Sequence, residues 1–338
     1  MDNLNVDISK RSAQAQTRST LYKVLKTTAE KIITTFDPHF LKKWEQTKRL
    51  KGPVVYLIYQ MGKVGSSSVA NMLRSSPLAS STIHVHDLSK DHFENLKILR
   101  ASKQDNYSRP LAGSFINETL RRKIDKLDRQ TKIRVITGVR DPIARDISAL
   151  FEIIDHPLVK KSTPDIKWHN YNHGIRLKAN HGIFNDNGDV HVGNTLNFLI
   201  NRFHQYEEDK DYSCQWFDTE LKSVFGIDIY NYPFDQTKGY TIIREGHIEI
   251  LILKVERMRE MLSIALNDFF EDDLAFIQSK SNEGDKKKTG ADYIQIKNTF
   301  RLPMQICKAI YNTRHFRHFY SDDERQALIK QWSTLEAN

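Results

Sequence analysis

Cysteines and long apolar runs are scarce in this sequence. Its 338 residues include 2 cysteines, Cys214 and Cys307, which are far apart and lack the spacing of a structural zinc site. A disulfide framework is therefore excluded, and a reducing compartment fits. No run of about 18 apolar residues could cross a bilayer, and the polar residues 1–16 contain no signal-peptide core. We therefore expect a cytoplasmic protein without a transmembrane segment.

Basic residues outnumber acidic ones. The chain has 51 Lys and Arg against 42 Asp and Glu, a formal net charge of +9. This surplus favours an anionic ligand such as a nucleotide, an acidic glycan or a lipid surface. The basic residues alternate with acidic ones instead of aromatics, so nucleic acid is not an expected partner. Peripheral contact with a membrane stays open.

The chain divides into three parts by its patterns. Residues 1–18 lack apolar periodicity, which predicts a disordered tail. Apolar residues recur at helical spacing over 19–51, which predicts a helical N-terminal extension. We expect residues 52–335 to form a single domain, with an insertion at about 155–215 that is rich in His, Asn and Gly.

Apolar, β-branched runs alternate with helical patterns in the main domain. Strands are predicted at 53–59, 82–86, 132–139 and 248–255, and helices at 67–74, 91–100, 118–127, 194–203, 258–274 and within 303–332. Strands of this continuous apolar kind are typical of parallel sheets that helices cover on both faces. The pattern therefore predicts an α/β fold, a three-layer sandwich around a central parallel sheet.

A loop of small residues follows the first strand, in Tyr59-Gln-Met-Gly-Lys-Val-Gly-Ser-Ser-Ser-Val69. Backbone N–H groups at such a strand-to-helix turn bind anions, and the helix dipole favours negative charge there. The candidate phosphate ligands are Gly62, Lys63, Val64, Gly65, Ser66, Ser67 and Ser68. The loop is not a Walker A motif, because Val64 follows the lysine and Leu57 stands where the first glycine belongs. An ordinary capping turn is the alternative.

A second anion site is predicted after the third strand, in Val139-Arg-Asp-Pro-Ile-Ala-Arg-Asp-Ile-Ser148. Asp141 is a good N-cap and Pro142 a good first helical residue. Arg140 therefore stands at the edge of the sheet where open α/β folds bind ligands, and its guanidinium suits a phosphate. Ser148 lies two turns into the helix, where core packing alone predicts no serine.

These two stretches together resemble the sulfotransferases that use 3′-phosphoadenosine 5′-phosphosulfate (PAPS). The stretch from Lys254 to Met258 is similar to that family's late strand, which ends in an acidic residue. The resemblance implies a P-loop NTPase-like sulfotransferase fold with helical N- and C-terminal additions. It implies that the loop of residues 62–68, here called the lysine loop, holds the 5′-phosphosulfate, and that Lys63 contacts the oxygen between the phosphate and the sulfuryl group. It also implies that Arg140 and Ser148 hold the 3′-phosphate. It implies no metal.

A closer resemblance is to bacterial proteins labelled as capsular polysaccharide synthesis proteins. It rests on the two loop motifs, on Gln215-Trp-Phe-Asp218 and on the ending from His318 to Glu324. The acceptor implied is a hydroxyl or amine, of a cell-surface polysaccharide or a glycolipid, while a small molecule or a protein stays open as the acceptor.

A general base is needed to take the acceptor's proton. His86 is the candidate, because it ends the second strand at the edge that carries the lysine loop. His84 has the same side-chain parity and is the alternative. A structural histidine, with Asp87 capping the next helix, is an equally good interpretation.

Other signals are weaker. His169 and His173 are four residues apart but have no HExxH frame, so a zinc site is not expected. Residues 185–189 predict an Asn-Gly hairpin turn in preference to a calcium loop. The lysines at 286–288 predict a solvated loop in preference to one that closes over the donor's nucleotide, which the resemblance to sulfotransferases would imply. A P-loop kinase or hydrolase, and a non-catalytic basic binding protein, remain alternative functions.

Overall fold

The computed structural model describes residues 45, 47, 50, 52–74, 76, 78, 82–101, 111–155, 167–170, 175–178, 182–185, 187–271 and 289–334. The expected tail at 1–18, most of the extension at 19–51, His173 and the lysines at 286–288 lie outside these ranges. Of the extension, Glu45 and Thr47 are helical, and the Lys123 ammonium donates to the Thr47 carbonyl at 2.5 Å.

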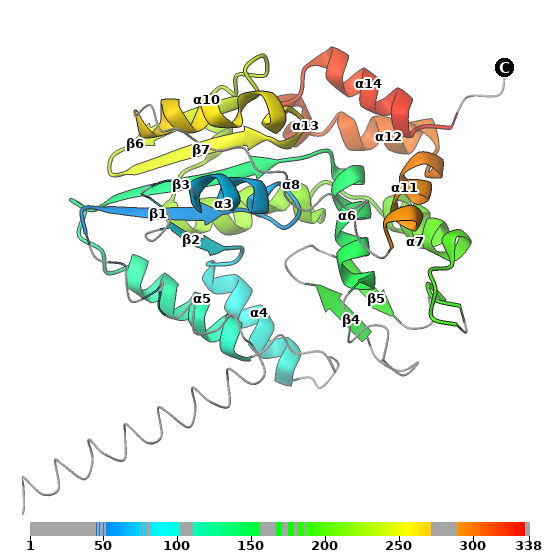
Figure 1. The fold of residues 1–338 in the computed structure, drawn as a ribbon, viewed down its shortest axis with the longest axis horizontal. Helices are drawn as coiled ribbons and strands as arrows, with labels where there is room; N and C mark the ends of the chain where they lie inside the picture. Colours follow the sequence, from blue (N-terminus) through cyan, green and yellow to red (C-terminus); the bar gives the residue numbers. More distant parts are fainter. Residues whose placement is uncertain are drawn as a thin grey trace, which may run out of the picture.

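A five-stranded sheet forms the centre of the fold, in the order β2-β1-β3-β7-β6 (Figure 1). Its strands are β1 (Val54–Tyr59), β2 (Thr82–Val85), β3 (Lys132–Val139), β6 (Tyr240–Glu245) and β7 (Ile248–Lys254). The four predicted strands are confirmed and pair in parallel, with Leu57 opposite both Ile83 and Val135.

The expectation of a purely parallel sheet is wrong, because β6 pairs antiparallel with β7. A two-residue turn joins these strands, whereas a parallel pair needs a long crossover connection. Gly246 in that turn has φ 59°, the left-handed conformation that tight hairpins require. The fold is thus α/β with a mixed sheet.

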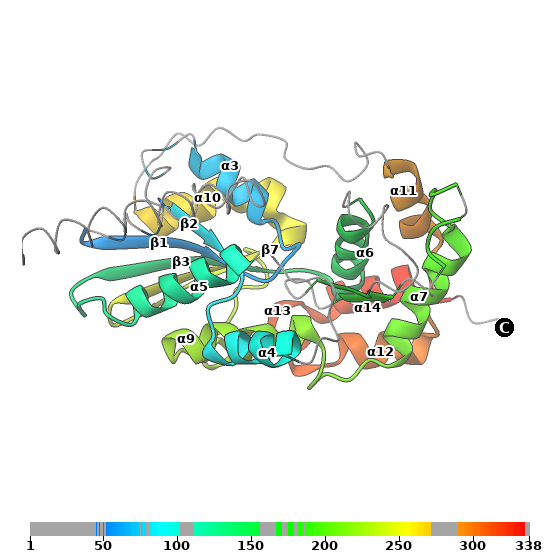
Figure 2. The same cartoon turned by 90° about the horizontal axis from the view of Figure 1, so that it is seen from below.

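Helices cover both faces of the sheet (Figure 2). On one face lie α3 (Ser66–Arg74) and α10 (Met258–Phe270), whose apolar residues pack with Ile58, Ile136 and Leu251. On the other lie α5 (Leu111–Ile124) and α8 (Tyr212–Trp216), which share a core with Leu57 and Val135. The expected layered arrangement is therefore present, although α5 begins earlier than the predicted 118 and α10 ends before the predicted 274.

The remaining elements gather mostly beyond the carboxyl ends of the parallel strands (Figure 1). They are α4 (Lys90–Ala101), α6 (Pro142–Ile154), β4 (Lys167–Asn170), β5 (Ile175–Lys178), α7 (Val192–His204), η4 (Phe217–Lys222), α9 (Ser223–Phe225), η5 (Ile229–Asn231), η6 (Val255–Arg257), α11 (Gly290–Thr299), α12 (Met304–Tyr311), α13 (Arg314–Phe319) and α14 (Asp322–Trp332). The C-terminal helical region is thus confirmed as three helices.

The segment predicted as an insertion, at about 155–215, contains a β4–β5 hairpin and a tight turn. His169 lies in β4, paired with Arg176 of β5. The turn at 185–189 is confirmed, since Phe184 and Val190 form an antiparallel bridge and the Asn185 N–H donates to the Asp189 carbonyl at 2.9 Å. Among the described helices, none has the length and apolar content to cross a membrane.

Candidate functional site

The loop between β1 and α3 has two residues in the left-handed conformation, Lys63 with φ 69° and Gly65 with φ 83°. Helix α3 starts directly afterwards, where the Ser68 and Val69 N–H groups donate to the Gly65 carbonyl at 3.0 and 3.2 Å. Backbone that alternates into this conformation turns successive N–H groups toward one point and forms an anion-binding concavity. The turn from strand to helix is therefore present, and its binding of an anion stays a prediction.

Glycines let this loop lie against its neighbours. A Cβ on Gly138 of β3 would come within 3.1 Å of the Val64 carbonyl, and one on Gly65 would come within 2.5 Å of the Met258 sulfur. Any side chain at either place would displace the loop or its neighbours. The close packing holds the loop between β3 and the start of α10.

The two predicted anion sites meet. The Arg140 guanidinium donates to the Lys63 carbonyl at 2.9 Å, although 77 residues separate them. Helix α6 begins just beyond, with the Asp141 carboxylate accepting from the Ile143 N–H at 3.2 Å and from the Ala144 N–H at 3.3 Å. The predicted N-cap is thus confirmed, and it fixes Arg140 beside the lysine loop.

Buried hydrogen bonds support this turn from behind. The Asp141 carboxylate also accepts from the Tyr311 hydroxyl at 2.6 Å and from the Trp332 indole at 2.9 Å. Its own N–H donates to Glu256 at 2.7 Å, and the Tyr320 hydroxyl donates to Glu256 at 3.1 Å. Burial raises the pKa of both carboxyls, while their hydrogen bonds act in the opposite direction. The network leaves the backbone at Arg140 little freedom to move.

One face of α6, which contains Glu152, is turned toward the lysine loop. The Lys63 ammonium pairs with Glu152 at 2.7 Å. Ser148 lies one turn before Glu152, and Ala144 one turn before Ser148, so the three share a face. All three are at least partly exposed, whereas most other residues of α6 are buried. Ser148 therefore lies on the face of α6 that Lys63 reaches.

The structure places His86 at the same edge, directly after β2. Its Nδ1 lies 2.7 Å from the Gln60 carbonyl. Because a carbonyl oxygen can only accept, Nδ1 carries the proton and Nε2 is the proton-accepting nitrogen of the neutral ring. The His84 and His86 rings meet edge to face, with their centroids 4.7 Å apart. The Trp216 indole N–H donates to the His86 carbonyl at 3.4 Å.

Two further residues at this edge, Gln60 and Glu220, are not identified as site residues by the sequence alone. Gln60 is fully buried, and among the described residues neither of its amide atoms has a hydrogen-bond partner. The sequence signal for Gln60 is its place as the polar residue directly after the apolar run 53–59. Glu220 accepts from the Tyr59 hydroxyl at 2.5 Å and from the Leu88 N–H at 2.8 Å. No local signal identifies Glu220, because its partners are distant in the sequence.

A family model matches the chain from residue 188 to residue 321. That family is described as "Putative capsular polysaccharide synthesis protein". The match includes Trp216, Glu220 and Glu256 and begins after the lysine loop and Arg140. It agrees with the resemblance drawn from residues 215–218 and from the stretch that begins at His318. No curated protein and no solved structure matches the chain.

Proposed function

We propose that this protein is a sulfotransferase that moves a sulfuryl group from PAPS to a hydroxyl or amine of a polysaccharide. The observation that carries the proposal is the hydrogen bond from Arg140 to the Lys63 carbonyl. It brings an anion-binding loop and a guanidinium to one edge of the sheet, as a donor with phosphate groups at both ends requires. Either site alone would suit any phosphate.

Each donor end has its own ligands in this proposal. The N–H groups of residues 62–68 and the Lys63 ammonium bind the 5′-phosphosulfate, and Arg140 with Ser148 binds the 3′-phosphate. The Gln60 amide is fully buried, and its oxygen lies 3.6 Å from where a Cβ on Gly138 would stand, next to the Val64 carbonyl. Bound donor replaces Glu152 as the partner of Lys63.

The chemistry assigned to the chain is an in-line displacement. The acceptor oxygen or nitrogen bonds to sulfur, the bond from sulfur to the phosphate oxygen breaks, and adenosine 3′,5′-bisphosphate leaves. His86 Nε2 takes the acceptor's proton, since Nδ1–H is held by the Gln60 carbonyl. Lys63 neutralises the charge that grows on the leaving phosphate, a contribution of about 3 to 4 kcal/mol for a preorganised donor.

The acceptor class comes from the family match. Residues 188–321 match proteins described by their role in capsular polysaccharide synthesis, and this range supplies Trp216, which contacts the backbone of His86. A polysaccharide or its glycolipid precursor is therefore the proposed acceptor.

The test is transfer of ³⁵S from labelled PAPS to surface polysaccharide or glycolipid fractions. We expect label in one fraction with the native protein and at least a hundredfold less with Lys63→Ala. Arg122→Ala, a change at an exposed arginine of α5, is the control and should retain transfer. Absence of label in every fraction would contradict the proposal.

A melting experiment separates the main alternatives. Stabilisation by adenosine 3′,5′-bisphosphate without Mg²⁺ is expected, and Lys63→Ala and Arg140→Ala should abolish it. Stabilisation by Mg²⁺-ATP alone would favour a kinase or hydrolase instead. Polyanion binding that both variants leave unchanged would favour a basic binding protein.

A further inference from the structure

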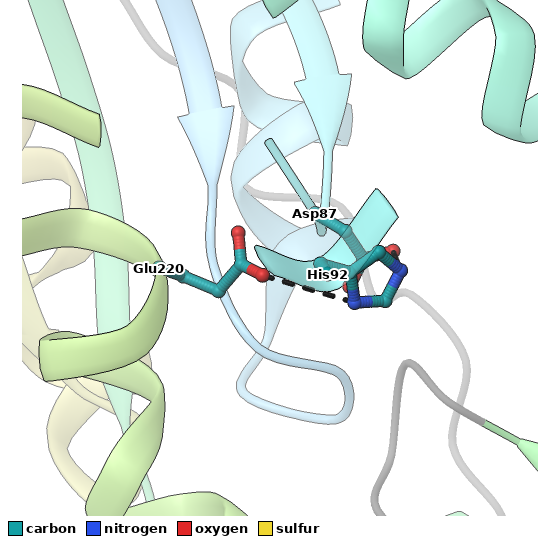
Figure 3. A group of neighbouring side chains, drawn as sticks. All are labelled: Asp87, His92 and Glu220. Carbon is teal, nitrogen blue, oxygen red and sulfur yellow. Dashed lines mark ion pairs between the residues drawn. The ribbon is translucent and has the colours of Figure 1, made fainter. Parts of the chain in front are cut away.

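Three side chains that the proposed transfer does not use meet near the ends of β1 and β2. Asp87 follows β2, His92 stands near the start of α4, and Glu220 belongs to η4 (Figure 3). His92 Nε2 lies 3.7 Å from Asp87, and Nδ1 lies 3.8 Å from Glu220. One ligand atom from each residue lies within 4.8 Å of the others.

The Glu220 carboxylate is held in one orientation. Its Oε2 accepts from the Tyr59 hydroxyl at 2.5 Å and from the N–H groups of Leu88 and Ser89 at 2.8 and 2.9 Å. Its Oε1 accepts only the Ser89 hydroxyl, at 2.8 Å, among the hydrogen bonds of the described residues, and faces His92. Such outer hydrogen bonds orient carboxylates that bind metals. Oε1 thus retains capacity for a further partner.

The His92 ring is in reach of both carboxylates without a hydrogen bond to either. Within the described ranges, its buried Nε2 has no hydrogen-bond partner. Separations of 3.7 and 3.8 Å exceed hydrogen-bond length. The two separations involve different ring nitrogens, Nε2 for Asp87 and Nδ1 for Glu220. With one ligand atom from each residue the set spans up to 4.8 Å. The ligand spacing around a tetrahedral zinc ion is about 3.3 Å for bonds of about 2.0 Å, so the three side chains have to draw together around an ion. The side chains of Asp87 and Glu220 are only 2% and 6% exposed, so water solvates this group poorly.

We propose that Asp87, His92 and Glu220 bind one divalent transition-metal ion, with Zn²⁺ the best fit. Two carboxylate oxygens and one imidazole nitrogen are ligands that Zn²⁺ accepts, with a fourth position for water. The residues come from three separate segments, so the ion joins the turn after β2 to η4. Asp87 adjoins His86, and the ion therefore anchors the segment that carries the proposed base. The site does not depend on the transfer chemistry.

The competing interpretation is a protonated His92 between two carboxylates. An ion pair of this kind needs no metal and responds to pH, whereas a metal site requires a neutral ring and responds to chelators. The two interpretations therefore predict opposite results when metal is added or removed at constant pH.

Co²⁺ is the probe for the test. Full-length protein is stripped with a chelator and titrated at pH 7.5 while the visible d–d absorption and the melting temperature are followed. We expect saturation at one equivalent, a raised melting temperature and displacement of Co²⁺ by Zn²⁺. His92→Ala and Asp87→Asn should weaken binding at least tenfold, and His318→Ala, a histidine outside the cluster, should not.

Two results would overturn the proposal. One is native protein that binds no Co²⁺ or Zn²⁺ at stoichiometric concentration. The other is equal binding by the native protein and by a folded His92→Ala variant. Should the variants not fold, the stoichiometry and absorption of the native protein decide. A protein that binds no metal but turns over PAPS contradicts the metal site and leaves the proposed function standing. A protein that binds metal but transfers no sulfuryl group contradicts the proposed function and leaves the metal site standing.

Discussion

The Arg140 guanidinium and the Lys63 main-chain carbonyl form a hydrogen bond of 2.9 Å that connects the loop after β1 to the loop after β3. Both residues belong to predicted anion sites, and both follow strands that are direct neighbours in the sheet. The side chain of Lys63 extends to α6, where it pairs with Glu152. Arg140 therefore holds the backbone of Lys63, and Glu152, twelve residues further along the same segment, holds its side chain.

Replacement of Arg140 by lysine should weaken the binding of adenosine 3′,5′-bisphosphate about tenfold to a hundredfold. An ammonium group lacks the planar fork that contacts a phosphate and the Lys63 carbonyl together. Isothermal titration calorimetry measures the change. Arg122→Lys on the exposed face of α5 is the matched control. Equal affinity in Arg140→Lys and native protein would exclude Arg140 from the site.

Replacement of Glu152 by glutamine should strengthen that binding, by up to about fivefold. The carboxylate competes with the ligand for Lys63, and its side chain is 45% exposed, so the pair contributes at most about 1 kcal/mol. Competition between native protein and Glu152→Gln for a fluorescent nucleotide analogue gives the ratio. Glu118→Gln on α5 is the control. Weaker binding would mean that Glu152 positions Lys63 for the ligand.

His86→Ala should lower kcat for sulfuryl transfer about 10²- to 10⁴-fold and leave the affinity for adenosine 3′,5′-bisphosphate nearly unchanged. Loss of a general base affects the proton transfer and not the phosphate contacts. The pH–rate profile should also lose its acidic limb, which a purely structural role would not alter. A pH–rate profile of unchanged shape in His86→Ala would mean that another residue is the general base. The same loss of kcat in His84→Ala, with His86→Ala unaffected, would assign that role to His84.

Tyr59→Phe should lower the free energy of unfolding by about 1.5 to 3 kcal/mol. The change removes a buried hydrogen bond to a carboxylate, that between Tyr59 and Glu220, and keeps the ring contacts with Trp216. Urea denaturation measures the difference. Tyr56→Phe on the same strand is the control, since that residue is only partly buried, and should stay within about 0.5 kcal/mol of the native value.

His315 should make the protein less stable as the pH falls. Burial lowers the pKa of this histidine from 6.5 to about 3. Between these values the unfolded chain binds a proton that the folded chain does not, so this residue removes up to about 1.4 kcal/mol per pH unit. His315→Gln retains a side-chain hydrogen-bonding group for the Tyr230 hydroxyl and removes the titration.

Urea denaturation of both proteins from pH 7 to pH 4 provides the measurement. Native protein should lose stability more steeply than His315→Gln below pH 6.5. The buried Asp141 and Glu256 carboxyls, whose pKa values are raised, act in the opposite direction in both proteins and cancel in the comparison. Parallel curves would mean that His315 gains its proton in the folded state as readily as in the unfolded chain.

The strands and turns that have strong local patterns follow from the sequence. The continuous apolar runs of β1, β3 and β7 identify them, and Asp141-Pro142 identifies the start of α6. Strand β6 was missed because its residues are mixed in polarity and only Tyr240 and Ile243 of it are buried. Its pairing with β7 depends on the Gly246 turn, whose two residues carry little information by themselves.

The sequence by itself determined a helix N-cap and the strands that precede the two loops predicted to bind anions, because each depends on residues that adjoin in the chain. Only the tertiary structure decided that Arg140 contacts Lys63, that Glu152 pairs with it, and that Glu220 binds Tyr59 across 161 residues. Such contacts depend on strand order and helix packing, which the folding of the whole chain establishes. The loop motifs therefore indicate an anion, and the packing around them indicates how it would be held.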